Sequence, residues 1–396
     1  MKIMSVNAGS SSLKFKLFNM PSEEEICSGL IEKIGSQKSI FTIKKLKQKK
    51  TQIIEIENHQ KAIKLLLNTF IEEQIVKNFA EIEGIGHRIV QGGELFTSPV
   101  ILTVESIKKI ETLNQLAPLH NPNNLLGITS FKKILPTVFQ VGVFDTTFHQ
   151  NIPQQNFLYA IPYEWYTKYK IRKYGFHGIS YEYVSQKSEQ LLNKKNAKMI
   201  ICHVGNGVSI AAIENGHSID TSMGFTPLEG VPMGTRSGNI DPTIISFIAE
   251  KENKTFKDVL SDLNTKSGLL GISGISNDGR DLEEMLMKNH ERSILAFDIQ
   301  IKRIVDYIAS YYVLLKGIDA LIFTGGIGEN SVFFRKEVVK RLKCLNFILD
   351  TQLNESKGEC IISTNKSAAK IMVIPTNEEI MIAKKVFHLK NIISKS

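Results

Sequence analysis

No run of apolar residues in this 396-residue sequence approaches the roughly 18 that a membrane-spanning helix requires. The N-terminal stretch turns polar after six residues. The four cysteines, Cys27, Cys202, Cys344 and Cys360, lie far apart and form no C-x-x-C pair, which argues against a disulfide framework. We therefore expect a protein of the reducing cytoplasm, with no membrane partner.

The usual signatures of nucleotide and hydrolase sites are also missing. The sequence contains no G-x-x-x-x-G-K-[ST], no G-x-G-x-x-G, no G-x-S-x-G and no H-E-x-x-H. These absences exclude a Walker-type ATPase, a dinucleotide-binding dehydrogenase of the Rossmann type, a serine hydrolase and a zinc protease of those patterns. The histidines are not at metal-ligand spacing, so zinc is not expected.

Composition and charge favour an ordinary globular chain of two or three domains, with 42% hydrophobic and 22% charged residues. Lys and Arg number 49 against 40 Asp and Glu, an excess of 9. The densest cluster, Lys44 to Lys50, has no interleaved aromatics, so we interpret it as a solvated hairpin edge and expect no nucleic-acid partner. Positive charge also suits phosphorylated, anionic substrates.

Two segments share one pattern of strand, glycine-bearing polar tip and strand. The first runs from Ile3 to Phe18 with its tip at Asn7 to Ser10, and the second from Met199 to Ile213 with its tip at His203 to Gly207. The recurrence predicts a duplicated α/β domain with a boundary near residue 150.

Further elements follow from periodicity and capping. We expect helices over 59–70, 128–135, 294–315 and 332–342, and strands over 138–144, 320–323 and 371–374. Asn330 or Ser331 is the expected cap of the helix that begins at Val332.

Glycine turns that end strands are the expected ligand sites of an α/β protein. At the first tip, Gly9, Ser10, Ser12 and Lys14 match a phosphate cradle, although a serine-rich tip is also an ordinary turn. The segment Gly325 to Asn330 has more glycine than a plain connection needs, and either interpretation stays open.

Several charged residues stand in short polar or glycine-containing segments. Arg88, Arg236 and Arg280 match carboxylate or phosphate recognition, with a structural salt bridge as the alternative for each. His177 is a candidate donor to a phosphoryl oxygen or a structural histidine. Asp145, which ends an apolar strand, is a catalytic or a turn residue, and Glu378 begins a helix or binds magnesium.

Ten motifs together resemble the acetate kinase (acetokinase) family, within the superfamily of actin-like ATPases and sugar kinases. They lie in the family's order from residue 3 to about residue 383: NAGSSSLK, GHRIVQGGE, PLHNP, VFDTTFH, YGFHGIS, HVGNG, GFTPLEG, MGTRSG, GIGEN and TNEE. The resemblance implies two duplicated actin-like ATPase (ribonuclease H-like) α/β domains with a ligand cleft between them. It implies an N-terminal lobe of residues 1–150 plus 381–396, and a nucleotide-binding, dimerising C-terminal lobe of residues 151–380.

The same resemblance implies an enzyme that transfers a phosphoryl group reversibly from ATP to acetate with Mg²⁺, for which Mn²⁺ can substitute, and a homodimer. It assigns Asn7 and Glu378 to the metal. It assigns catalysis to Arg88, Asp145, His177 and Arg236. The implied substrate contacts are Arg88, Val90, Leu119, His120, Phe176 and Pro227. The implied nucleotide contacts are Ser10, Ser12, Lys14, His203, Val204, Gly205, Asn206, Gly207, Asp278, Gly279, Arg280, Gly326, Ile327, Gly328, Glu329 and Asn330.

Two positions depart from the family pattern: Asn239 stands where many relatives have Asp, and Gln91 replaces a common His. The alternatives are a propionate or butyrate kinase of the same family and a non-catalytic nucleotide-binding module. Asp145 either exchanges a proton or only orients an arginine, and the residues do not decide between these roles.

Overall fold

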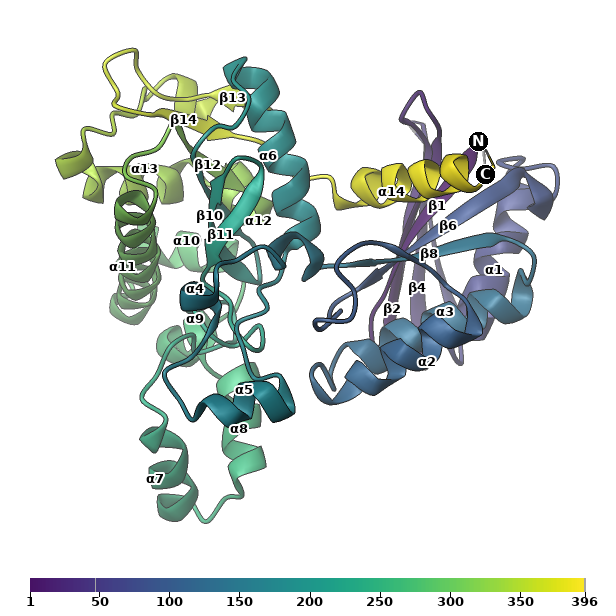
Figure 1. The fold of residues 1–396 in the computed structure, drawn as a ribbon, viewed down its shortest axis with the longest axis horizontal. Helices are drawn as coiled ribbons and strands as arrows, with labels where there is room; N and C mark the ends of the chain where they lie inside the picture. The colour runs from purple at the N-terminus through teal and green to yellow at the C-terminus, as the bar shows by residue number, and fades with distance from the viewer. Residues whose placement is uncertain (47, 395–396) are drawn as a thin grey trace. The chain divides into compact units, whose positions relative to one another are not determined.

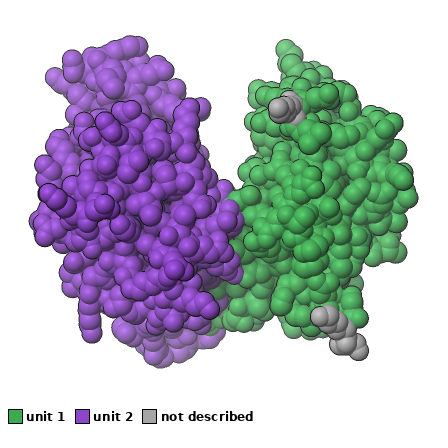
Figure 2. Space-filling model, turned by 90° about the horizontal axis from the view of Figure 1, so that it is seen from above, with its two compact units in different colours: residues 1–147, 377–396 green, residues 148–376 purple. Residues whose placement is uncertain are grey.

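A computed structural model of the chain describes residues 1–46 and 48–394. Lys47, in the predicted lysine-rich hairpin, and residues 395–396, at the end of the predicted N-terminal lobe, lie outside the described residues. The chain divides into two compact units (Figure 2). Unit 1 comprises Met1–Thr147 and Asn377–Ser396, and unit 2 comprises Phe148–Thr376.

Unit 1 is built on a mixed sheet with the strand order β5-β4-β3-β2-β1-β6-β8-β7 (Figure 1). The strands are β1 (Lys2–Ala8), β2 (Ser12–Asn19), β3 (Glu24–Glu32), β4 (Ser36–Lys45), β5 (Gln48–Ile56), β6 (Ile82–Ile89), β7 (Val100–Ile101) and β8 (Phe139–Phe144). Its helices are α1 (His59–Glu72), α2 (Val104–Thr112), α3 (Asn121–Ile134) and α14 (Glu378–Ile393), with short 3-10 turns at Phe79–Glu81 and Leu113–Gln115.

The two faces of this sheet bury different side chains because successive residues of a strand point to opposite sides. Met4 and Val6 of β1 belong to a core shared with α1 and α3. On the other face, α14 packs so closely on β6 that a Cβ on Gly86 would lie 2.3 Å from Ile382 Cγ2. In β2, apolar residues alternate with Lys14 and Lys16, as a half-exposed strand requires.

Unit 2 contains a second mixed sheet, with the order β11-β10-β9-β12-β14-β13. The strands are β9 (Met199–Val204), β10 (Val208–Glu214), β11 (His217–Thr221), β12 (Ala320–Thr324), β13 (Cys360–Ile361) and β14 (Lys370–Val373). The helices are α4 (Gln154–Phe157), α5 (Tyr163–Tyr169), α6 (Gly178–Leu192), α7 (Thr243–Lys251), α8 (Phe256–Thr265), α9 (Gly268–Ser273), α10 (Gly279–Met287), α11 (Glu291–Leu314), α12 (Gly325–Asn330) and α13 (Val332–Arg341), with 3-10 turns at Lys343–Leu345 and Leu353–Glu355. A further 3-10 turn, Thr147–His149, begins at the last residue of the first segment of unit 1.

The two sheets repeat one topology. The series β3-β2-β1-β6-β8-β7 and the series β11-β10-β9-β12-β14-β13 share the same succession of two antiparallel, two parallel and one antiparallel pairing. Unit 1 adds the β4–β5 hairpin, in which Lys44 pairs with Lys49. The predictions of a duplicated α/β domain and of a lysine-rich hairpin edge are therefore confirmed.

Local predictions hold with two differences. The helix expected over 128–135 begins earlier, at Asn121, because Pro122 fits the first turn of a helix. The expected glycine turn at Gly325 to Asn330 is the short helix α12, and Ser331 rather than Asn330 caps α13 by accepting from Phe334 N at 2.9 Å. Within residues 1–46 and 48–394, no helix has both the length and the apolar character needed to cross a membrane.

Candidate active site

In unit 1, the carboxyl ends of the parallel strands bring charged and polar candidates together. Asn7 and Arg88 lie near the ends of β1 and β6, and Asp145 directly follows β8. Helix α14 runs back along β6, since Lys390 near its end donates to Glu83 O while Glu378 in its first turn lies 3.8 Å from Arg88 Nε. Four predicted site residues therefore share one edge of the sheet.

Arg88 and Asp145 form a bidentate ion pair. Arg88 Nε donates to Asp145 Oδ1 at 2.9 Å, and Arg88 Nη2 donates to Oδ2 at 2.6 Å. Burial opposes the charge of Arg88, but Asp145 and Glu378 together raise the pKa of Arg88 above its usual value. Burial raises the pKa of Asp145, and the charge and hydrogen bonds of Arg88 act against that rise. Arg88 therefore remains a cation held in one orientation.

The first hairpin tip presents the predicted phosphate contacts. Asn7 pairs across the hairpin with Lys14, and the Lys14 ammonium forms an ion pair with Glu379, next to Glu378. Ser10 is exposed and Ser12 is half-buried. A Cβ on Gly9 would lie 2.8 Å from Ser12 Oγ, so a larger residue there would require the Ser12 hydroxyl to move. The tip carries a lysine and two hydroxyls beside the metal candidates.

Two asparagines that sequence reasoning missed hold the backbone of the predicted pocket. Asn124 Oδ1 accepts from Val90 N at 3.1 Å, and its Nδ2 donates to Ala8 O at 2.8 Å. Asn121 exchanges two hydrogen bonds with the backbone of Gln91. Both asparagines are buried on α3, a combination that the NPNN sequence could have signalled because buried polar groups require partners.

The remaining substrate candidates of unit 1 differ in exposure. Val90 is buried, whereas Leu119 is 66% exposed. His120 is the N-cap residue of α3. A positive charge on His120 acts to lower the pKa of Asp145. Leu119 is therefore in contact with solvent in this structure.

In unit 2, His177 and Arg236 converge on the tip of the β9–β10 hairpin. A Cβ on Gly207 would lie 3.3 Å from His177 Nε2 and 3.7 Å from Arg236 Nη1. Arg236 Nη1 donates to the Pro227 carbonyl at 3.3 Å. Burial lowers the pKa of Arg236, and within the described part of the chain no carboxylate forms an ion pair with it. The guanidinium of Arg236 therefore lies beside the hairpin tip without an ionic partner among the described residues.

His177 is fixed by hydrogen bonding and stacking. It precedes α6 in a left-handed conformation, with φ of 57°. Its Nδ1 lies 2.8 Å from Ser209 Oγ, and its ring stacks on His203 with centroids 4.1 Å apart. His203 Nδ1 in turn lies 2.9 Å from Ser180 Oγ. The Nε2 atom of His177 is thus held toward Gly207.

A cavity of about 690 Å³ in unit 2 is lined by eight of the thirteen nucleotide contacts predicted in this unit. Those that line it are Gly205, Asn206, Asp278, Gly279, Arg280, Gly326, Ile327 and Asn330, with Asn277, Glu283 and Ser331 in addition. The other predicted contacts of this unit, His203, Val204, Gly207, Gly328 and Glu329, are not among its lining residues. Asp278 caps α10 and binds Arg280 through two side-chain hydrogen bonds.

Glu329 and Arg335 hold the backbone of α12, which lines part of this cavity. Glu329 Oε1 accepts from Gly325 N at 2.9 Å and from Thr376 N at 3.0 Å. Arg335 is fully buried and donates to the carbonyls of Gly328 and Glu329 at 3.0 and 2.8 Å. Glu329 therefore holds the backbone of α12 in this structure, and sequence reasoning missed Arg335.

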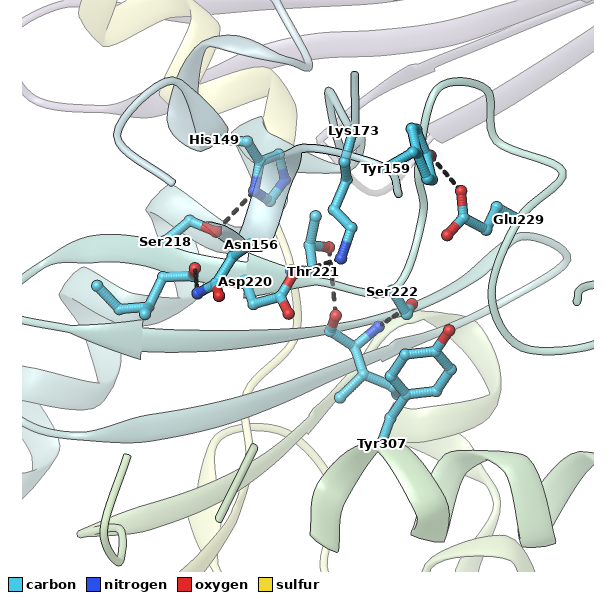
Figure 3. Close-up of polar contacts among 12 residues, drawn as sticks. His149, Asn156, Tyr159, Lys173, Ser218, Asp220, Thr221, Ser222, Glu229 and Tyr307 are labelled. Atoms are coloured by element: carbon cyan, nitrogen blue, oxygen red, sulfur yellow. Dashed lines mark hydrogen bonds and ion pairs between the residues drawn. The ribbon is translucent and has the colours of Figure 1, made fainter. Parts of the chain in front are cut away.

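The buried side chain of His149 contacts the backbone of Phe176 and the side chain of Ser218. Its Nε2 lies 2.9 Å from Phe176 O. Its Nδ1 lies 2.8 Å from Ser218 Oγ (Figure 3). Burial lowers the pKa of His149 to about 4. A neutral ring that donates from Nε2 to the carbonyl and accepts at Nδ1 from the hydroxyl satisfies both contacts. The buried Phe176 is thereby fixed beside His177.

Known proteins match this chain along almost its whole length. The sequence pattern described as Acetokinase family matches residues 2–384. The chain belongs to the acetokinase family. It is 64% identical to the acetate kinase of Phytoplasma mali (strain AT), covering 99% of this chain and 100% of that protein. It is 53% identical to that of Bacillus subtilis (strain 168), covering 98% and 99%.

Solved structures agree in fold. The crystal structure of Porphyromonas gingivalis acetate kinase has a TM-score of 0.93 at 39% identity, with 98% of this chain and 99% of that chain covered. A propionate kinase from Francisella tularensis has a TM-score of 0.94 at 41% identity and the same coverage. The predicted fold class, family and kinase activity are confirmed.

The neutral state of buried His149 predicts a pH dependence of stability. The pKa of His149 is about 4 in the folded protein and about 6.5 when unfolded, so folding loses stability as pH falls through this range. We expect His149→Gln to remove up to about 2 kcal/mol of the loss in unfolding free energy between pH 7 and pH 5. Denaturant titrations at both pH values measure it.

The control is His217→Gln, which changes an exposed histidine of the same unit and should keep the pH dependence of the unmodified protein. Equal losses of stability for all three proteins would contradict a neutral, buried His149.

Proposed function

We propose that this chain transfers the γ-phosphoryl group of ATP to acetate, reversibly and in line, giving acetyl phosphate and ADP. Arg236 carries the proposal. Its half-buried guanidinium has no carboxylate partner within the described residues and lies close to His177. An unpaired buried cation is costly unless a ligand supplies the opposite charge. A carboxylate or a transferring phosphoryl group supplies it in bidentate geometry.

The chemistry asks for positioning more than for proton transfer. A carboxylate is ionised at pH 7, so its nucleophilic oxygen needs no strong base. In the proposed reaction, Arg88 and Arg236 bind substrate oxygens and His177 donates to the phosphoryl group as charge develops. Val90, Leu119, Phe176 and Pro227 contact the methyl group, and His120 lies among the substrate contacts.

Asp145 acts on Arg88 in this proposal. Its two oxygens are both engaged by the guanidinium, an arrangement that orients the arginine. A carboxylate held this way has little freedom to exchange a proton with substrate. We therefore propose orientation as the role of Asp145.

The residues proposed for Mg²⁺ fit that ion. Glu378 offers a carboxylate in the first turn of α14, which packs on β1, and Asn7 offers an amide oxygen that no described residue engages in a hydrogen bond. No group of three or more His, Cys, Asp or Glu in residues 1–46 and 48–394 is arranged to hold a metal. Mg²⁺ keeps several waters and binds through one or two carboxylates plus substrate phosphates, so it needs no such group. When bound, it would offset phosphate charge, as Mn²⁺ could.

ATP is proposed to occupy the cavity of unit 2, with Ser10, Ser12 and Lys14 of unit 1 as further phosphate contacts. The cavity volume of about 690 Å³ falls within the usual range for small-ligand pockets. The predicted homodimer, formed through unit 2, and the cytoplasmic location stay predictions.

A second candidate substrate is propionate. The match to the Francisella tularensis propionate kinase, at 41% identity and a TM-score of 0.94, supports this candidate. One methylene changes discrimination by only about 1–3 kcal/mol, so some turnover of propionate is expected from an acetate kinase. Rates measured with acetate, propionate and butyrate rank the acids.

Arg236→Ala should lower acetate-dependent ADP release with ATP and Mg²⁺ by about a hundredfold or more, because the charge at the transferring group is lost. The control is Arg303→Ala, which removes an exposed arginine of α11 and should leave the rate unchanged. No turnover of any acid by the unmodified protein, despite ATP binding, would favour a binding module over an enzyme.

Glu378→Gln should raise the Mg²⁺ concentration for half-maximal rate by about tenfold, because a neutral amide is a weaker ligand for a hard cation. Glu72→Gln removes an exposed carboxylate of α1 in the same unit and should leave this concentration unchanged. A Mg²⁺ titration of each variant at saturating ATP separates the two; equal shifts would remove Glu378 from the metal site.

Asp145→Asn should keep turnover within about tenfold of the unmodified enzyme, because an amide oxygen still accepts one hydrogen bond from Arg88. Asp145→Ala should lose more and be less stable, since it leaves Arg88 without its main partner. The rates and unfolding free energies of both variants test the assignment. A loss of turnover in Asp145→Asn as large as in Asp145→Ala would restore a proton-transfer role.

A further inference from the structure

Pro227 and Arg236 lie on a segment that has no helix or strand to hold its shape. It runs from residue 222, after β11, to residue 242, before α7. A long irregular segment keeps one conformation only if specific contacts fix it. The contacts that fix this one therefore bear directly on where Pro227 and Arg236 lie.

One phenol oxygen binds this segment on both sides of Pro227. The Tyr159 hydroxyl accepts a hydrogen bond from Phe225 N at 2.7 Å. It donates to Glu229 Oε2 (Figure 3). Phe225 and Glu229 lie two residues before and two residues after Pro227. The Tyr159 oxygen thus closes a small ring of chain whose middle residue is Pro227.

The Tyr159–Glu229 pair is tightly enclosed. A Cβ on Gly224 would lie 1.7 Å from Glu229 Oε2 and 2.1 Å from Tyr159 Oη, so only glycine leaves room for the pair. Burial, followed by the charge of Glu229, raises the pKa of Tyr159, so the hydroxyl keeps the proton that it donates. A hydrogen bond to a charged acceptor is stronger than one between neutral groups.

The effect of this pair reaches Arg236 through the backbone. The Pro227 carbonyl that Tyr159 helps to fix accepts a hydrogen bond from Arg236 Nη1. Asn239 closes the next stretch, because its Oδ1 accepts from Gly230 N at 2.8 Å and its Nδ2 donates to Tyr307 Oη at 2.9 Å. At the start of the segment, Gly224 O accepts from Tyr174 N, three residues before His177.

Tyr159 is itself held by a rigid neighbourhood. It lies between α4 and α5, where Asn156 Nδ2 donates to Ile219 O at 3.0 Å and Lys173 N donates to Phe157 O at 2.8 Å. The Arg172 guanidinium lies 3.7 Å from the centre of the Phe157 ring. Tyr159 can therefore act as a fixed point rather than follow the segment.

We propose that Tyr159, with Glu229 as its acceptor, is a positioning residue for the acyl substrate: it sets the geometry of Pro227 and, through the Pro227 carbonyl, of Arg236. Tyr159 belongs to none of the motifs that resemble the family. The inference rests on the proposed function for its kinetic consequence only; its structural consequence can be measured without substrate.

Tyr159→Phe removes one oxygen and keeps the ring. We expect the KM for acetate to rise about tenfold, the value of losing a hydrogen bond to a charged group, while the KM for ATP stays within about twofold. The matched control is Tyr163→Phe, the same change at a 58% exposed tyrosine four residues away, and it should behave as the unmodified enzyme. Glu229→Gln keeps an acceptor for Tyr159 and should stay close to the unmodified enzyme, whereas Glu229→Leu should resemble Tyr159→Phe.

A purely structural role would instead reduce only the amount of active enzyme and leave both the KM for acetate and kcat per active site unchanged, and that result would overturn the proposal. Amide hydrogen exchange gives a second readout. Exchange in residues 223–236 should be faster in Tyr159→Phe and unchanged in the rest of unit 2. If the unmodified protein turns over no acid, the proposed function fails, and unchanged exchange in residues 223–236 would then reject the positioning role as well.

Discussion

A strand buried on both faces can carry a charged side chain only where it leaves the sheet, and this constraint organises both units. The strands β8, β12 and β14 consist almost wholly of apolar residues. Asp145 comes directly after β8, and α12, whose Gly326 lines the cavity of unit 2, comes directly after β12. The same edge of the first sheet receives Arg88 and the first turn of α14. Charged and polar site residues lie at strand ends because burying such groups inside the sheet would cost free energy.

The charges gathered there differ in what neutralises them. Arg88 has Asp145 in bidentate geometry and Glu378 nearby, so its orientation is set before any ligand arrives. Among residues 1–46 and 48–394, Arg236 donates hydrogen bonds only to the Pro227 carbonyl and to the sulfur of Met233. Arg88 is thus oriented by carboxylates before a ligand binds, whereas the charge of Arg236 has no carboxylate partner among the described residues. Such preorganisation places the cost of orienting a cation in folding rather than in binding.

The elements of the fold were predictable from the sequence, but their bracing contacts were not. Alternation and glycine tips identified both hairpins, and apolar runs identified β8, β12 and β14. Strand and helix periods describe neighbours in the chain, whereas Tyr159 and Glu229 are 70 residues apart and His149 and Ser218 are 69 apart. Nothing local to Tyr159 reveals its acceptor. Glu329 shows the same limit, because its motif marks it as a site residue and only the structure shows its carboxylate holding Gly325 and Thr376.

Thr376 is the last residue of unit 2. The chain passes between the units only at Thr147 to Phe148 and at Thr376 to Asn377. Glu329, on α12, accepts from Thr376 N, and Thr376 Oγ1 lies 2.7 Å from Ser180 Oγ, which in turn contacts His203. Asn377, the next residue, caps the helix that carries Glu378. The contact between Glu329 and Thr376 therefore lies one residue from the cap of the helix proposed to bind the metal.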